Sequence, residues 1–283
     1  MSLRETLERG GSLVIPGVGD ALGAMLVEQA GFPCVYLSGY QVSAVNGYPD
    51  VGLVTLTEMV AQAARVCAAV SCPVIADGDN GHGGIANVVR TVREFETAGV
   101  SAIHLEDQAL PKKCGHMQGH VLIPAGEMCA KITAAVEARR SRDFLIIGRS
   151  DAIGTLGLEE AIRRGAAYRR AGADALMVMA PRSVDDLKRY REAVDGPLVV
   201  TVGSWSFPIT ADELRAIGYQ VILFPVSLMR RTVTVLRESL AELKATGTLD
   251  HGPSAMVPMH EMHDILGLKG LLDREARCAV AAE

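Results

Sequence analysis

The sequence predicts an α/β protein with a closed (β/α)8 barrel of the TIM type. Eight short apolar segments alternate with longer segments of helical periodicity over 283 residues. Several helical segments end in a glycine followed at once by the next apolar segment, as in Gln29-Ala30-Gly31-Phe32 and Thr97-Ala98-Gly99-Val100. Because glycine adopts the left-handed conformation that closes a helix, this recurrence marks helix-to-strand turns. Eight such units favour a closed barrel over an open doubly wound sheet.

The element boundaries follow from this alternation. Short apolar runs identify the strands, which we expect at residues 13–16, 35–38, 74–77, 102–106, 145–149, 175–178, 198–201 and 221–225. Amphipathic runs between them identify the helices, which we expect at residues 21–29, 57–69, 86–98, 126–139, 158–171, 184–193, 211–217 and 228–245. Residues 1–283 are interpreted as a single barrel domain. Residues 246–283, with a short helical pattern at about 262–272, are interpreted as its C-terminal helical extension.

Two connections are longer than a barrel turn requires. They are residues 39–56 after the second strand and residues 107–125 after the fourth. Long loops in compact domains are often lids or binding loops. The second connection contains the stretch Lys112-Lys113-Cys114-Gly115-His116, with Gly119 and Pro124 as hinges. We therefore expect this loop to move over a binding site.

The composition excludes several classes of protein. The net charge is −5 and the isoelectric point is about 5.8, whereas nucleic-acid binding normally needs a basic surface. Mean hydropathy is +0.21, yet no apolar run approaches the roughly 18 residues that cross a bilayer. We thus expect no nucleic-acid partner, no membrane segment and a small anionic substrate.

The cysteines and the first residues indicate a cytoplasmic protein. Six cysteines are scattered without a CxxC pair, which is typical of reduced thiols rather than of a disulfide framework. The first eleven residues lack the basic start and apolar core of a secretory signal. A cytoplasmic location is the resulting expectation.

Polar side chains follow four successive apolar runs. In a (β/α)8 barrel the strand ends converge on one mouth, where reactive groups gather. The side chains that follow these runs are Ser38 and Gly39, Asp77 and Asp79, Glu106 and Asp107, and Arg149 and Asp151. We expect them to lie close together.

The glycine-rich loop after the third strand predicts a metal site. It places Asp77 and Asp79 at alternating positions, so that both can approach one hard cation. Mg²⁺ prefers oxygen ligands and keeps several waters, so these two carboxylates and Glu106 suffice, and Mn²⁺ is a second candidate. A capping turn ahead of the next helix is the structural alternative. Carboxylates gathered at one mouth need a compensating cation or shared proton, which favours the metal. His82 and His116 are weaker candidate ligands.

Cys114 lies in a cationic environment formed by Lys112, Lys113 and His116. A thiol exchanges its proton near neutral pH when neighbouring positive charge lowers its pKa toward that range. The stretch therefore favours an acid/base thiol, and the alternative is an inert thiol in a surface loop.

Arg149 ends the fifth predicted strand. Its guanidinium can hold a substrate carboxylate through two parallel hydrogen bonds. The alternative is an ion pair with Asp151 or Glu106, and the sequence by itself does not separate the two interpretations.

In the order of its motifs, the chain resembles the isocitrate lyase and phosphoenolpyruvate mutase superfamily. The resemblance covers most of the chain and rests on Tyr36-Leu37-Ser38-Gly39, Tyr48-Pro49-Asp50-Val51-Gly52, the Asp77 loop, Glu106-Asp107, the 112–116 stretch and Gly148-Arg149-Ser150-Asp151-Ala152. It implies a barrel with Mg²⁺ at the strand ends and a mobile loop that closes over a 2-hydroxy or 2-oxo carboxylate. It also implies a homotetramer in which the last barrel helix is exchanged between paired subunits.

Within the superfamily, the 112–116 stretch is similar to the lyase branch, which includes methylisocitrate lyase and dimethylmalate lyase. The resemblance implies that Cys114 protonates the carbon of the departing carboxylate fragment. It also implies that Asp50, Asp77, Asp79 and Glu106 hold the metal and its waters, that Ser38, Gly39 and Arg149 hold the oxo-acid half, and that Gly115 and His116 contact the other carboxylate.

Two strand ends depart from the pattern of that branch. At the sixth, where a glutamate is expected, residues 177–181 read Met-Val-Met-Ala-Pro. At the seventh, where an asparagine is expected, residues 201–204 read Thr-Val-Gly-Ser. His82 stands where the Asp loop usually carries a tyrosine or phenylalanine. Because the two strand-end changes remove polar contacts, a 2-alkylmalate is favoured over a tricarboxylate such as methylisocitrate.

The sequence thus leads to the hypothesis of a Mg²⁺-dependent carbon–carbon lyase of carboxylic acid metabolism, which cleaves a 2-hydroxy dicarboxylate to an oxo acid and a carboxylate. The expected catalytic residues are Cys114, Asp50, Lys112, His116 and Arg149. The general base is left open between Asp50, His82 and a metal-bound water. The alternatives are a decarboxylase or hydrolase of an oxaloacetate-like acid, a phosphonomutase-related enzyme on the same barrel, and a non-catalytic organic-acid-binding protein.

Overall fold

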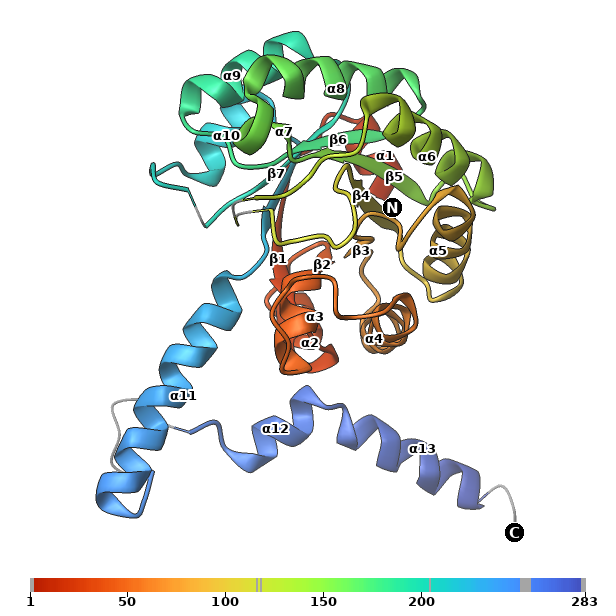
Figure 1. Cartoon of the computed structure of the whole chain (residues 1–283). Helices are drawn as coiled ribbons and strands as arrows, with labels where there is room; N and C mark the ends of the chain where they lie inside the picture. The colour runs from red at the N-terminus through yellow and green to blue at the C-terminus, as the bar shows by residue number, and fades with distance from the viewer. Residues whose placement is uncertain (1–2, 116, 118, 204, 250–255, 281–283) are drawn as a thin grey trace. The chain divides into compact units, whose positions relative to one another are not determined.

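The computed structural model describes residues 3–115, 117, 119–203, 205–249 and 256–280. The chain divides into two compact units, Met1–Leu228 and Met229–Glu283. The first unit contains eight strands with helices around them, and the second consists of helices (Figure 1).

A closed barrel of parallel strands forms the first unit. Each strand pairs with the next along the chain, and β8 pairs with β1. The strands are β1 (Leu13–Val18), β2 (Val35–Leu37), β3 (Val74–Asp77), β4 (Ala102–Glu106), β5 (Leu145–Ser150), β6 (Ala175–Val178), β7 (Leu198–Thr201) and β8 (Val221–Phe224). The predicted (β/α)8 barrel is therefore confirmed, and each predicted strand agrees with an observed one to within two residues at either end.

The predicted helices are also present, each to within one residue at either end. They are α2 (Ala21–Gln29), α4 (Leu56–Ala69), α5 (Ile85–Thr97), α6 (Ala125–Ala138), α8 (Leu158–Arg170), α9 (Val184–Ala193), α10 (Ala211–Ile217) and α11 (Ser227–Thr246). A capping box begins α4, in which the Thr55 hydroxyl accepts from the Glu58 N–H and the Glu58 carboxylate accepts from the Thr55 N–H. The same arrangement of Thr210 and Glu213 begins α10.

Three short helices were not expected from the sequence. They are α1 (Leu3–Glu8), α3 (Gly39–Val45) and α7 (Ala152–Leu156). Each has seven residues or fewer, which is too short for apolar periodicity to separate a helix from a loop. The predicted long connection at 39–56 is consequently helical over its first part.

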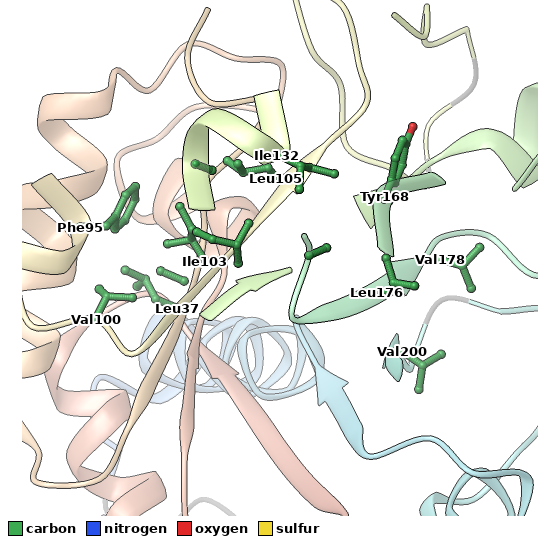
Figure 2. Close-up of a cluster of buried hydrophobic side chains, with 14 of the residues drawn as sticks. Leu37, Phe95, Val100, Ile103, Leu105, Ile132, Tyr168, Leu176, Val178 and Val200 are labelled. Carbon is green, nitrogen blue, oxygen red and sulfur yellow. The ribbon is translucent and has the colours of Figure 1, made fainter. Parts of the chain in front are cut away.

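Two apolar layers stabilise the barrel. One lies between strands and helices and includes Leu37, Ile103 and Tyr168 (Figure 2). The other is built from the alternate strand residues, such as Ile147, and therefore fills the barrel interior. Leu3 of α1 belongs to this second layer. Helix α1 thus covers the barrel interior at one end.

The place of α1 is fixed by a polar contact. The Arg4 guanidinium donates to the carbonyl of Arg142 and to the carboxylate of Asp174, both at 2.7 Å. These two residues precede β5 and β6, so α1 lies at the N-terminal ends of those strands. The C-terminal ends of the strands remain available for a site.

The second unit contains most of α11, followed by α12 (Met259–Ile265) and α13 (Leu268–Val280). The helical pattern expected at 262–272 spans two helices, because Gly267 adopts a left-handed φ of 72° between them. Val233, Leu236, Leu240 and Leu243 of α11 are exposed. Within the described ranges, no helix is both long and apolar enough to span a bilayer.

The close approach of β1 to the segment after β8 gives a test of barrel closure. A methyl group on Gly17 would lie 2.5 Å from the carbonyl oxygen and 2.7 Å from the Cα of Pro225. Because these are backbone atoms, Gly17→Ala should lower the free energy of unfolding by about 1–3 kcal/mol or more. Urea unfolding followed by circular dichroism measures the change.

The matched control is Gly126→Ala in α6. A methyl group there meets no atom within 4 Å, and alanine is the better helix former, so stability should stay equal or rise by up to about 1 kcal/mol. If both variants unfolded at the same urea concentration, the barrel would not depend on the contact at Gly17.

Candidate active site

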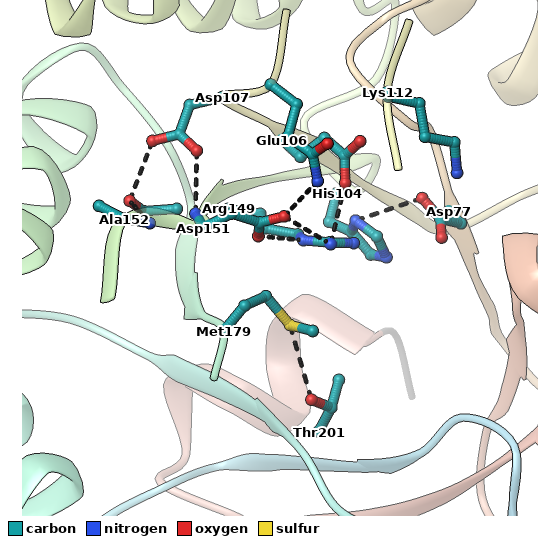
Figure 3. A network of polar contacts seen from close by, with 12 residues as sticks. Asp77, His104, Glu106, Asp107, Lys112, Arg149, Asp151, Ala152, Met179 and Thr201 are labelled. Atoms are coloured by element: carbon teal, nitrogen blue, oxygen red, sulfur yellow. Dashed lines mark hydrogen bonds and ion pairs between the residues drawn. The ribbon is translucent and has the colours of Figure 1, made fainter. Parts of the chain in front are cut away.

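Charged side chains from three neighbouring strands meet at the C-terminal end of the barrel. The sheet register pairs Asp77 with His104 and Glu106 with Arg149. All four side chains are buried, and Figure 3 shows them facing one another beneath Lys112 of the loop after β4. We expected the residues at these strand ends to lie close together. The register brings them together because the parallel strands all end at one edge of the barrel.

Lys112 reaches from the loop into this cluster. Its Nζ lies 2.5 Å from Asp50 Oδ1 and 2.5 Å from Asp79 Oδ1. Burial alone would lower the pKa of Lys112, but the carboxylates around it outweigh burial and raise the pKa well above its ordinary value. Lys112 is therefore a permanent cation that joins the loop after β4 to the segments that follow β2 and β3.

Asp77 is held from two sides within the barrel. Its Oδ1 accepts from the Asp79 N–H at 3.0 Å and lies 3.6 Å from His104 Nδ1, while Tyr36 Oη lies 2.9 Å from His104 Nε2. Burial alone would raise the pKa of Asp77, but His104, Lys112 and Arg149 lower it below its ordinary value. Burial lowers the pKa of His104 to about 4. His104 is thus neutral at pH 7, and Lys112 and Arg149 are the cations that keep Asp77 ionised there.

Arg149 is engaged by two carboxylates. Its Nη2 lies 2.9 Å from Glu106 Oε2, and it donates to Asp151 through Nε at 2.8 Å and Nη2 at 2.9 Å. Of the two interpretations of Arg149, the ion pair with Asp151 and Glu106 is the one present in this structure. Burial raises the pKa of Glu106 well above its ordinary value in spite of Arg149. A two-point contact with Asp151 holds the guanidinium plane in a fixed orientation.

The 112–115 segment lies over this mouth. The Cys114 N–H donates to the carbonyl of Asp50 at 3.0 Å, and the Cys114 side chain is half-buried. A methyl group on Gly115 would lie 2.5 Å from Arg149 Nη2 and 3.0 Å from the terminal methyl of Met179. Only a residue without a side chain can approach Arg149 this closely, so Gly115 and Arg149 are direct neighbours.

Four sequence-predicted residues remain. Ser38, Gly39 and His82 are described by the structure, and His116 is not. Gly39 is part of the cluster, because a methyl group there would meet Asp77 Oδ2 at 2.7 Å. Ser38 is buried beside it, and its N–H donates to the carbonyl of Val18. His82 has a left-handed φ of 56°, and burial lowers its pKa. His116 lies outside the described residues.

The donor chemistry of the cluster fits a hard divalent cation. Asp77, Asp79 and Glu106 offer oxygen atoms only, as Mg²⁺ prefers. Two of these oxygens, Asp79 Oδ1 and Glu106 Oε1, are buried and make no hydrogen bond with any described residue, although Asp79 Oδ1 is within ion-pair distance of Lys112. Among the described residues, no three His, Cys, Asp or Glu side chains are arranged as a metal centre. Lys112 lies beside Asp79 and Arg149 beside Glu106, so both side chains place positive charge next to these carboxyl groups.

A second buried network, which the sequence did not reveal, supports the first. The Asp107 carboxylate accepts from Ser150 Oγ at 2.9 Å, the Asp151 N–H at 2.9 Å, Arg164 Nη1 at 2.9 Å and Tyr168 Oη at 2.7 Å. A signal existed, because Arg164 stands four residues before Tyr168 on the buried face of α8. The network fixes the backbone of Asp151 and so the partner of Arg149.

The fold and the site together define a class of protein, a (β/α)8-barrel enzyme with a carboxylate-rich mouth under a thiol-bearing loop. Residues 3–244 match the family model described as phosphoenolpyruvate phosphomutase. The chain is 41% identical over 276 residues to 2,3-dimethylmalate lyase of Eubacterium barkeri. The aligned region covers 96% of each sequence.

Solved structures agree with this match. The structure of oxaloacetate acetylhydrolase with the inhibitor 3,3-difluorooxalacetate has a TM-score of 0.93 at 32% identity and covers 98% of this chain and 96% of that one. Phosphonopyruvate hydrolase with oxalate and Mg²⁺ has a TM-score of 0.89 at 31% identity and covers 97% of each chain. The chain belongs to the phosphoenolpyruvate mutase/isocitrate lyase superfamily, as its motifs predicted.

His104 is buried in its neutral form, and this predicts that the folded protein loses stability in acid. The unfolded chain binds a proton at His104 below a pKa of about 6.5, whereas the folded barrel does so only below about 4. Stability is therefore fully present above pH 6.5 and falls as the pH drops toward 4. His104 should contribute a loss on the order of 2 kcal/mol between pH 7 and pH 5.

Urea unfolding of the wild type and of His104→Gln at the two pH values measures this contribution. Glutamine keeps a hydrogen-bonding group near Tyr36 but does not titrate, so the variant should lose less stability on acidification than the wild type. Equal losses in the two proteins would show that His104 does not remain neutral in the fold.

Proposed function

We propose that this protein is a Mg²⁺-dependent carbon–carbon lyase that cleaves a 2-alkylmalate to a 2-oxo acid and a carboxylate. The reaction class, lysis of a 2-hydroxy dicarboxylate, agrees with the name of its relative 2,3-dimethylmalate lyase, so the predicted lyase function is confirmed at that level. The observation that carries the proposal is the position of the Cys114 loop, whose Lys112 pairs with Asp50 and Asp79 while Gly115 meets Arg149.

Asp77, Asp79 and Glu106 would hold the magnesium ion, with Mn²⁺ as a substitute. When bound, the ion supplies Lewis-acid polarisation of the substrate 2-hydroxyl and carboxylate. Support comes from the oxygen-only donors of these residues and from the Mg²⁺ in a solved structure of phosphonopyruvate hydrolase. We assign the substrate carboxylate of the oxo-acid half to Arg149, whose guanidinium plane is fixed by Asp151, with Ser38 and Gly39 beside it.

The proposed reaction needs one proton removed and one delivered. Asp50, next to Lys112, accepts the proton of the 2-hydroxyl, and the oxygen forms the carbonyl of the oxo acid as the C2–C3 bond breaks. The electron pair moves to C3 and into the adjacent carboxylate. Lys112 and Arg149, with His116, balance the negative charge. The Cys114 thiol then protonates C3 and releases the second carboxylate.

The wall of the mouth at β6 and β7 supports a substrate of low polarity. Met179 and Thr201 are buried there, and the Thr201 hydroxyl donates to Met179 Sδ at 3.6 Å (Figure 3). Since Thr201 already has a partner and Met179 offers only a thioether and methyl, this wall suits an alkyl group. A third carboxylate would lie there without a partner.

We also propose a cytoplasmic homotetramer built from one barrel domain, with residues 246–283 as its extension. Exposed Val233, Leu236, Leu240 and Leu243 recur at helical spacing along α11 and support exchange of this helix between subunits.

Cys114→Ser tests the proton donor. Serine occupies a similar volume but is a far weaker acid, so kcat should fall by about 100-fold or more. Mg²⁺ binding, measured by titration calorimetry, should stay unchanged because Cys114 is outside the assigned ligands. Full activity of the variant would assign the proton to another group.

A panel of substrates tests the function itself. With Mg²⁺, 2-methylmalate should yield pyruvate and acetate, and 2,3-dimethylmalate should yield pyruvate and propionate. Methylisocitrate should be cleaved with a kcat/KM lower by about tenfold or more, because its extra carboxylate meets Met179. Enzyme-coupled detection of pyruvate follows the reactions, and a chelator provides the blank.

Oxaloacetate belongs in the same panel, because the structure of oxaloacetate acetylhydrolase is among the similar ones. Release of oxalate from oxaloacetate, with no cleavage of the alkylmalates, would replace the lyase by a hydrolase. No turnover of any member would favour an organic-acid-binding protein.

A further inference from the structure

Gln108 is a buried side chain that joins the loop after β4 to the barrel. It follows Glu106 and Asp107 at the end of β4 and is only 1% exposed. Its backbone pairs with Leu122 in an isolated antiparallel bridge, and its carbonyl accepts from Asn80 Nδ2 at 3.3 Å. The backbone of Gln108 therefore belongs to the fixed base of the loop, and its side chain is free of any role in the barrel core.

The side chain of Gln108 satisfies both backbone groups of Lys113. Its Oε1 accepts from the Lys113 N–H at 2.9 Å, and its Nε2 donates to the Lys113 carbonyl at 2.9 Å. One amide thus binds Lys113 as a neighbouring strand would. Lys112, which enters the carboxylate cluster, and Cys114, the assigned proton donor, flank this residue directly.

The same amide nitrogen reaches the site beneath. Gln108 Nε2 donates to Asp151 Oδ2 at 2.5 Å, and Asp151 is the carboxylate that orients Arg149. A single side chain therefore contacts the loop that carries Cys114 and the residue that fixes the guanidinium plane.

We propose that Gln108 is a positioning residue, which holds the 112–115 segment docked over the mouth and couples that position to the orientation of Arg149. The proposal rests on the proposed function in so far as Cys114 acts on a substrate held by Arg149. Gln108 itself touches no reacting atom. Its amide is needed because only a group that accepts and donates at once can satisfy Lys113 and also reach Asp151.

Gln108→Met tests the proposal in the full chain. Methionine has a similar length but makes none of the three contacts, so the segment should leave the mouth more often. Trypsin cleaves after Lys113 only when the segment is undocked, and the rate of cleavage at Lys113–Cys114, followed by mass spectrometry, should rise about tenfold or more. This measurement requires no substrate, so it tests the role of Gln108 independently of the proposed function.

Kinetics provide the second readout. Displacing the thiol and loosening Arg149 should lower kcat with 2-methylmalate by roughly tenfold or more, and KM should rise less than kcat falls. The melting temperature should stay close to that of the wild type, because Gln108 packs against the loop rather than in either apolar layer.

The matched control is Gln220→Met. Gln220 also hydrogen-bonds to the backbone, accepting from the Leu198 N–H at 2.9 Å, but it lies at the N-terminal ends of β7 and β8. Its variant should leave both cleavage at Lys113 and kcat unchanged. If Gln108→Met does not fold, Gln108→Glu serves instead, since it keeps the acceptor for the Lys113 N–H and loses the donor to the Lys113 carbonyl and to Asp151.

Wild-type resistance to trypsin at Lys113 in a folded Gln108 variant would overturn the proposal. So would equal acceleration in the Gln220 variant, because a general loosening of the barrel would then account for the cleavage. Faster cleavage without any measurable turnover would support the role of Gln108 while rejecting the proposed reaction.

Discussion

The structure depends on mutual compensation of charges that the barrel buries at one mouth. Moving an ion from water into a protein interior costs roughly several kcal/mol unless opposite charges and hydrogen bonds replace the lost water. Here Lys112 lies between Asp50 and Asp79, and Arg149 lies between Glu106 and Asp151. Each cation faces two acidic side chains, so removing either would leave buried carboxyl groups short of a partner. The apolar layers supply the stability that allows such a cluster to persist.

The fold makes this compensation possible through the register of the strands. Because β4 and β5 pair Glu106 with Arg149, opposite charges stand side by side on neighbouring strands at the same height. In the second network, a buried carboxylate is again compensated by a cation, because Asp107 accepts from Arg164. Asp107 also accepts from the backbone N–H of Asp151 and so fixes the position of that residue. An arginine of α8 completes it, so a helix on the outside of the barrel takes part in orienting a group at its mouth.

The sequence predicted what depends on local pattern. The strands and their charged ends follow from short apolar runs, and Asp77, Glu106 and Arg149 could be placed because they end such runs. The contacts of Lys112 could not be predicted, since they depend on the path of a long loop in three dimensions. Arg164 was missed because an arginine on an amphipathic helix usually faces water. The spacing of four residues from Tyr168 was the available signal, because it places Arg164 on the buried face of α8.

The position of the loop is tied to the charge of the mouth. Of the two cations at the mouth, Lys112 belongs to the loop after β4 and Arg149 belongs to β5. Undocking would withdraw Lys112 from Asp50 and Asp79 and leave these carboxylates to water or to a divalent ion. Docking, conversely, brings a cation and the Cys114 segment to the mouth in one movement. A substrate dianion and a divalent ion alter that balance in opposite directions, so the electrostatics of binding and the placement of the thiol are parts of one equilibrium.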